Sequence, residues 1–295
     1  MKIKSFNVMF FLAAVVFFLC TQCDKNISSG QDSGNPGGSS KRNSSVNNQA
    51  SAAQNTAASI VEKIVPHRQE AVLAWNQFNS ENGNKGRIYW NKKTGYPEMI
   101  VGNPVYPKGL SNSKKNELMM KGKTETQEES QYLSEMFLKE NEPLLGIKTE
   151  KLGHFKSKKA GINTVVFFEQ MEQEIPVYNA YLKCILNDKG QTLIVENHFY
   201  PDIAVNINPS LTDEDAKHIA MSQFPVDVDL TNVTVGRNPP KLYVLPKNSD
   251  FVTLASDHLC WVFDLGSTTQ PIGFLFFVDA SDGTVLFKKD LITVQ

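Results

Sequence analysis

Histidine and cysteine side chains can bind a metal or act as nucleophiles, and this 295-residue chain has only a few of each. The histidines are His67, His154, His198, His218 and His258. None is followed by Glu and no two lie four residues apart, so no helix face can present the two imidazoles and the Glu base of a His-Glu-x-x-His zinc site. A metal site needs three or four converging groups. We therefore expect surface or helix histidines, no metal and no cofactor.

Cys20 and Cys23 follow an unbroken apolar run, Val8–Leu19. That run is shorter than the roughly 20 apolar residues that span a bilayer, and it matches the hydrophobic core of a secretory signal. A cysteine directly after such a core resembles the lipidation site of bacterial lipoproteins, where the thiol takes a diacylglyceryl group and fatty acids such as palmitate anchor the chain. Cys23 is the better candidate and Cys20 the alternative, because a polar segment begins at Asp24.

The first 59 residues are therefore expected to hold a signal peptide (residues 1–22) and a lipidated cysteine with a flexible tether (residues 23–59). The tether is rich in Ser, Asn and Gly, and such a segment buries too little to offset its ordering entropy. We expect export to the bacterial cell envelope and a lipid anchor, with the outer membrane or cell surface favoured. The alternative is ordinary signal cleavage and a soluble secreted protein.

Cys184 and Cys260 are the remaining cysteines. In an exported protein they could form a disulfide. The alternative is two buried thiols, since free Cys packs as a small hydrophobe.

Composition excludes little beyond nucleic-acid binding. The formal net charge is −1 and 41% of the residues are hydrophobic, as in an ordinary globular protein. A nucleic-acid partner rewards a basic face, which this balance does not favour.

Hydrophobic periodicity predicts helices followed by antiparallel strands, twice. Before the second predicted helix, Asp188, Lys189 and Gly190 stand where a hairpin turn is needed. Thr212 is placed to cap that second helix. The predicted helices are Val61–Phe78, Thr126–Lys139 and a segment from Thr212 to Phe224; the predicted strands are Arg87–Trp90, Thr164–Gln170, Ile175–Asn187, Gln191–Tyr200, Lys241–Leu245, His258–Leu265, Gly273–Ala280 and Thr284–Lys289. This order implies an α+β fold of two successive units, each a helix packed on a curled antiparallel β-sheet.

Several motifs resemble the propeptides of fungalysin-type and thermolysin-type metallopeptidases. WNKKTGYPEMIVG resembles the first hairpin of their propeptide domain, and NEPLLGI its short segment before the sheet. VVFFEQMEQEIPVYNAYLKCILNDKGQ resembles its characteristic strand pair, with Glu174 where Gly is usual. The matching positions are Gln170, Ile175, Pro176, Val177, Asp188 and Gly190.

The last third resembles a PepSY domain, which follows that module in the same propeptides. LTDEDAKHIA matches its helix, and GFLFFVDASDGTVLFKKDLI matches its closing hairpin. The matching positions there are Val278, Asp279, Ala280, Gly283, Val285 and Leu286. The resemblance implies a propeptide-like domain over residues 60–208 and a PepSY-like domain over residues 209–295.

The resemblance implies a non-catalytic lipoprotein that binds, and inhibits or chaperones, a thermolysin-like zinc metallopeptidase in trans. It also implies that the tail approaches the peptidase cleft through Leu291, Ile292, Thr293, Val294 and Gln295; the alternative is a terminus without function. The alternative for the whole chain is a surface interaction, adhesion or structural lipoprotein that keeps the fold without a protease role.

Overall fold

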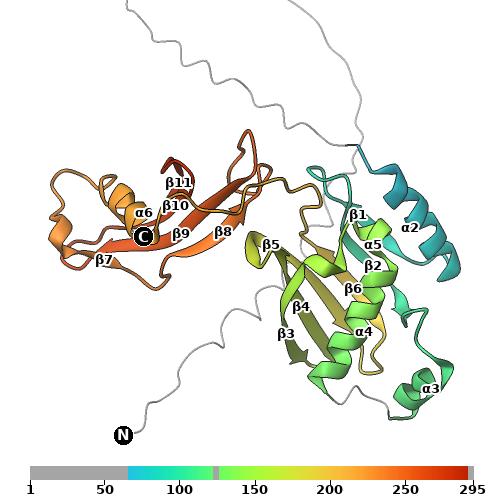
Figure 1. Cartoon of the computed structure of the whole chain (residues 1–295). Helices are drawn as coiled ribbons and strands as arrows, with labels where there is room; N and C mark the ends of the chain where they lie inside the picture. Colours follow the sequence, from blue (N-terminus) through green and yellow to red (C-terminus); the bar gives the residue numbers. More distant parts are fainter. Residues whose placement is uncertain (1–65, 122–125, 292–295) are drawn as a thin grey trace, which may run out of the picture. The chain divides into compact units, whose positions relative to one another are not determined.

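The computed structural model describes residues 66–121 and 126–291 (Figure 1). By their contacts, all of these described residues belong to one compact unit.

Eleven strands of the described residues form one hydrogen-bonded sheet system. The first sheet has the order β1-β2-β6-β5-β4-β3, and every neighbouring pair is antiparallel. The second sheet has the antiparallel order β8-β9-β10-β11, with β7 beside β9. The strands are β1 (Arg87–Trp90), β2 (Pro97–Val105), β3 (Leu152–Ala160), β4 (Asn163–Glu172), β5 (Ile175–Leu186), β6 (Thr192–Asn197), β7 (Val233–Val235), β8 (Lys241–Leu245), β9 (His258–Ser267), β10 (Gly273–Asp279) and β11 (Val285–Asp290).

The two sheets join through β5, where Val177 pairs in parallel with Val244 of β8. The helices of the described residues are α2 (Gln69–Glu81), α3 (Asn112–Lys121), α4 (Gln127–Glu140), α5 (Glu142–Leu145) and α6 (Asp213–Met221), with 3₁₀ turns η1 (Thr149–Lys151) and η2 (Leu230–Asn232).

Helix α4 forms where a cap and an apolar stripe coincide. The Thr126 hydroxyl accepts the Glu129 N–H at 3.1 Å, which satisfies a donor that a helix start leaves open. Leu133, Phe137 and Leu138 are at most 2% exposed. Each such side chain contributes about 1.5–3 kcal/mol when it is fully buried.

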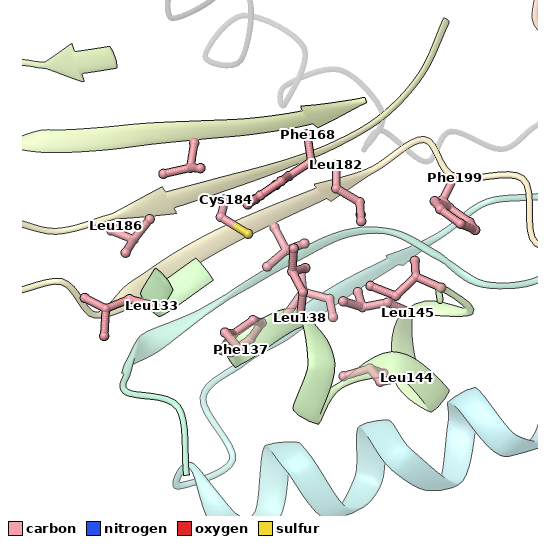
Figure 2. Packing of buried hydrophobic residues seen from close by; sticks show 14 of the residues in the cluster. Leu133, Phe137, Leu138, Leu144, Leu145, Phe168, Leu182, Cys184, Leu186 and Phe199 are labelled. Atoms are coloured by element: carbon pink, nitrogen blue, oxygen red, sulfur yellow. The ribbon is translucent and has the colours of Figure 1, made fainter. Parts of the chain in front are cut away.

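Those side chains pack on one face of the first sheet, which we call the inner face. Figure 2 shows Leu133 near Leu186 of β5, and all three side chains belong to one cluster with Phe168 of β4 and Leu182 of β5. Because side chains alternate across a strand, the residues between these point to the opposite face, which we call the outer face.

Helix α6 covers the second sheet. Thr212 and Asp215 form a capping box: the Thr212 hydroxyl accepts the Asp215 N–H, and the Asp215 carboxylate accepts the Thr212 N–H. The buried Ala216 and Ala220 let the helix lie close to Phe263 and Phe276 of the strands. The α+β class, with a helix packed on a sheet in each half, is confirmed.

Some predicted elements have different bounds in the structure. The helix expected over Val61–Phe78 was to be interrupted or opened by Pro66; after Pro66 the structure has a helix over Gln69–Glu81, and residues 61–65 lie outside the described residues. The strand expected to reach Tyr200 ends at Asn197, whose side-chain oxygen accepts the Phe199 N–H and turns the chain out of the sheet.

Candidate functional site

Gln170, Ile175, Pro176 and Val177 lie around the hairpin where β4 turns into β5, whereas Asp188 and Gly190 lie in the turn between β5 and β6. Gln170 is fully buried; its amide donates to the Tyr200 carbonyl at 2.9 Å and its oxygen accepts the Tyr200 N–H at 2.8 Å. Gln170 therefore fixes the segment that leaves the first sheet. Neither end of its amide is free for a partner.

The turn of that hairpin has an uncommon backbone. Gln173 and Glu174 have φ of 47° and 72°, the left-handed region that favours glycine. In the sequence, Glu174 stands at a position of this turn where Gly is usual. The structure forms the tight two-residue turn with both side chains in place.

Ile175, Pro176 and Val177 begin β5 directly after the turn. Pro176 pairs with Met171, and Val177 pairs with Val244 of the second sheet. The Ile-Pro-Val motif therefore lies at the junction of the two sheets, where Val177 is buried with Val244 and Ala280.

An aromatic hollow lies beside this hairpin, and sequence reasoning missed it. Its volume is about 230 Å³ and its lining includes Phe167, Tyr181, Asn179 and Tyr243. The Phe167 and Tyr181 rings stack with centroids 5.0 Å apart. Asn179 has φ of 59° in the middle of β5, beside an irregularity in the β4–β5 register. The only sequence signal was the density of aromatic residues in these two strands.

The hydroxyls that adjoin the hollow stay protonated at neutral pH. Burial raises the pKa of Tyr181, and the neighbouring carboxylate of Glu196 adds to that increase. Burial also raises the pKa of Tyr178. The hollow can therefore offer ring faces and neutral hydroxyls to a partner.

Asp279 of the PepSY-like motif closes the β10–β11 turn. One carboxylate oxygen accepts the Ser281 N–H at 2.7 Å and the Ser281 hydroxyl at 2.5 Å. The other oxygen lies 2.5 Å from His258 Nδ1, and His258 Nε2 lies 3.2 Å from the Ser256 hydroxyl.

This Ser256–His258–Asp279 chain has the order of groups found in serine hydrolases. Asp279 at the same time holds the turn through Ser281, and Ser256 lies on the segment that enters β9. We therefore assign the three side chains to joining the start of β9 to the end of β10. Sequence reasoning missed the contact, since only the β9–β10 register brings residues 21 apart together.

Cys184 and Cys260 are free thiols, so the disulfide that the sequence allowed is not formed. Cys184 lies in the core between α4 and the first sheet, whereas Cys260 lies in a separate cluster with Leu245 and Phe277. The alternative of two buried thiols matches the structure. Burial raises the pKa of Cys184 to about 12 and also raises that of Cys260.

The remaining expected site residues are mostly outside the described residues: Cys20, Cys23, Ile292, Thr293, Val294 and Gln295. Leu291 is described and is 45% exposed; its N–H donates to the Gly273 carbonyl at 2.9 Å, which continues the β10–β11 pairing by one residue. Over residues 66–121 and 126–291, no three or more His, Cys, Asp or Glu side chains are placed to hold a metal ion. No helix within those ranges has the length and apolar character needed to span a membrane.

Comparisons with known proteins found likenesses among solved structures. No family model matches the chain, and no curated protein matches it. Among solved structures, the Bacillus megaterium YpeB C-terminal domain aligns with a TM-score of 0.31 and 17% identity, over 78% of this chain and 100% of that one.

Proposed function

We propose that the chain is a non-catalytic binding module that inhibits or chaperones a thermolysin-like zinc metallopeptidase in trans. The observation that carries this proposal is the order of propeptide-type motifs along the sequence, from WNKKTGYPEMIVG to GFLFFVDASDGTVLFKKDLI. Those motifs fall on two sheets with packed helices, the class of fold expected for propeptide-like and PepSY-like units.

The hydrogen bonds of the motif residues support a binding role. Gln170 uses its hydrogen bonds to hold the segment that follows β6, and Asp279 uses those to Ser281 to close the β10–β11 turn. A module that recognises a partner needs this kind of rigid framework, because rigid elements hold a contact surface at low entropic cost. Recognition is then a property of the exposed faces of the sheets.

We also propose that Cys23, with Cys20 as the alternative, carries the lipid anchor at the bacterial cell envelope. The apolar run Val8–Leu19 and the polar residues after Cys23 support this. Each buried CH₂ of the acyl chains contributes about 0.8 kcal/mol to membrane attachment. An anchored inhibitor would meet exported peptidases at the membrane surface.

The tail offers a sharper form of the proposal. Residues Leu291–Gln295 would enter the peptidase cleft. Deleting these five residues should weaken inhibition of the peptidase at least tenfold if the tail supplies a principal contact. Unchanged potency would remove the tail from the mechanism and leave binding to the folded surface.

Isolation of the full chain from its native membrane with bound proteins tests the function directly. Recovery of a zinc peptidase in an amount equimolar with the isolated chain supports the proposal. Recovery of matrix or envelope proteins in its place would contradict it and favour the alternative, an interaction or adhesion lipoprotein.

A further inference from the structure

The outer face of the first sheet carries an ordered set of side chains. The strand registers place Lys158, Val165, Ile185, Ile194, Val101 and Arg87 in one row across six strands. The next row, two residues along each strand, is Lys156, Phe167, Lys183, Glu196, Met99 and Tyr89. Both rows point away from α4, because their strand neighbours Val166, Cys184 and Val195 are in the inner core.

The centre of the first row is apolar. Val165, Ile185, Ile194 and Val101 come from four adjacent strands, and all four are only partly buried. None of them belongs to the four apolar clusters formed by the described residues, nor packs against one. These aliphatic side chains therefore form an apolar strip that the described part of the chain leaves unpartnered.

The second row carries both apolar and polar groups. Phe167 and Met99 flank an ion pair between Lys183 and Glu196, and Phe167 also lines the aromatic hollow. The strip and the hollow are thus continuous through Phe167. An apolar centre with a few fixed polar groups is the composition of a protein–protein interface.

The two edges of the surface are both cationic. Lys158 and Lys156 lie on edge strand β3, and Arg87 lies on edge strand β1; all three are exposed. Within the described residues Lys158 and Arg87 make no ion pair. The Lys156 Nζ lies 3.8 Å from the Glu169 Oε1, which is a long ion pair. With about 4.8 Å between strands, the two edges lie roughly 24 Å apart.

This charge distribution disfavours two classes of partner, a second copy of the chain and a lipid surface. Two copies packed face to face would set cationic edges against cationic edges in either alignment, so self-pairing is repulsive. The Lys183–Glu196 pair in the centre would lose its hydration against lipid without new partners. The surface fits a folded protein with an apolar patch and carboxylates on either side of it.

We propose that this outer face docks the peptidase, which would present an apolar patch flanked by acidic residues. The inference rests on the proposed function, since it names the surface through which that function is exercised. The apolar strip supplies the contact that holds the complex, and the cationic edges steer its formation.

Two double substitutions separate these contributions. Ile185→Glu with Ile194→Glu places charges in the strip; Lys158→Glu with Arg87→Glu reverses the edges. Each double substitution has a control that makes the same kind of change elsewhere. For the strip it is Leu73→Glu with Ile162→Glu, at side chains that are 62% and 74% exposed. For the edges it is Arg237→Glu with Lys289→Glu, at two exposed side chains. Circular dichroism and thermal unfolding of each full-chain variant establish that it is folded.

Binding is measured by surface interferometry against thermolysin-type catalytic domains from the same genome, at low and high salt. The strip variant should dissociate at least tenfold faster, because central apolar contacts set complex lifetime. The edge variant should associate at least tenfold more slowly at low salt and lose salt dependence. The controls should bind as the unmodified chain does.

The outcomes distinguish the two proposals. If the unmodified chain binds a peptidase and both outer-face variants bind equally well, the docking surface is wrong and the function stands. Equal losses in the controls would likewise overturn this surface. If the unmodified chain binds none of these peptidases, the proposed function fails, and the peptidase is not the occupant of this face.

Discussion

Buried amides determine how the chain leaves the first sheet. Asn197 donates to the carbonyls of Pro97 and Leu145 at 2.9 and 2.7 Å, and it accepts the Phe199 N–H at 3.0 Å. Gln170 holds Tyr200 in the same segment. Buried polar groups of this kind are costly when unpaired, so the path from β6 toward the second sheet is determined by individual hydrogen bonds.

Glu174 carries backbone strain that a single substitution can relieve. Its φ of 72° costs a side-chain-bearing residue about 1 kcal/mol. Glu174→Gly should therefore raise the free energy of unfolding by about 0.5–1 kcal/mol in urea denaturation. Glu98→Gly is the control, since Glu98 is exposed in β2 without a positive φ and its loss should destabilise the chain. Equal effects of the two substitutions would contradict the strain.

Asp279 should couple stability to acidic pH. Burial by itself raises the pKa of Asp279, but hydrogen bonds from the Ser281 side chain and backbone and from His258 outweigh it, so the pKa lies below its ordinary value. A lowered folded-state pKa gives stability that is complete above the unfolded pKa, about 3.9, and is lost as pH falls through the folded pKa.

Asp279→Asn should therefore cost about 1–3 kcal/mol of unfolding free energy at pH 7. Denaturation at a series of pH values should show this difference staying constant down to about pH 4 and shrinking below it. A difference that is constant through the acidic range would show that the carboxylate charge does not contribute.

At the scale of elements, Gly283 sets how closely α6 approaches the β10–β11 turn. Its φ is 80°, and an added Cβ would lie 2.5 Å from Ile219 Cδ1 of the helix. Gly161, in the β3–β4 turn, has φ of 63° with nothing within 4 Å of an added Cβ. Both glycines need the left-handed backbone, but only Gly283 also needs the space.

Gly161→Ala should accordingly cost about 1 kcal/mol of unfolding free energy, the cost of the backbone conformation alone. Gly283→Ala should cost roughly 1 kcal/mol more, because the Ile219 side chain must leave its present rotamer. Urea denaturation of the two variants side by side measures the difference. Equal costs would mean that α6 does not pack tightly on this turn.

Elements with clear periodicity or caps were predictable from the sequence, and the others were not. The alternation of β4 and β5 and the cap at Thr212 identified their elements correctly. Strand β3 was missed because Lys156, Lys158 and Lys159 give it the polarity of an exposed edge. Helix α3 was missed since it has one buried residue, Leu118, and therefore no apolar stripe.

The candidate surface was less predictable than the elements. The inner core of the first sheet follows from alternation, but which residues share a row on the outer face depends on strand register. Registers here include irregularities between Ile185 and Leu186 and between Val101 and Val105. The contact of His258 with Asp279 likewise depends on pairing between distant strands.

At the scale of the whole molecule, strand β5 serves both sheets. Val177 near its start pairs with β8, and Tyr178 packs edge-on against Tyr243 and Phe277 of the second sheet and against Phe251 of the loop between β8 and β9. Of its later residues, Leu182, Cys184 and Leu186 belong to the first sheet's core. The two sheets therefore share a strand and a buried contact, which agrees with the described residues all belonging to one compact unit.

We propose that this folded unit binds a thermolysin-like peptidase and does not itself cleave a bond. Titration of the purified full chain into the zinc peptidase encoded in the same genome, with hydrolysis of a peptide substrate as the readout, tests it most directly. We predict stoichiometric, saturable loss of peptidase activity and no hydrolysis by the chain alone. Undiminished peptidase activity at a large excess of chain, or chelator-sensitive hydrolysis of casein by the chain alone, would contradict the account.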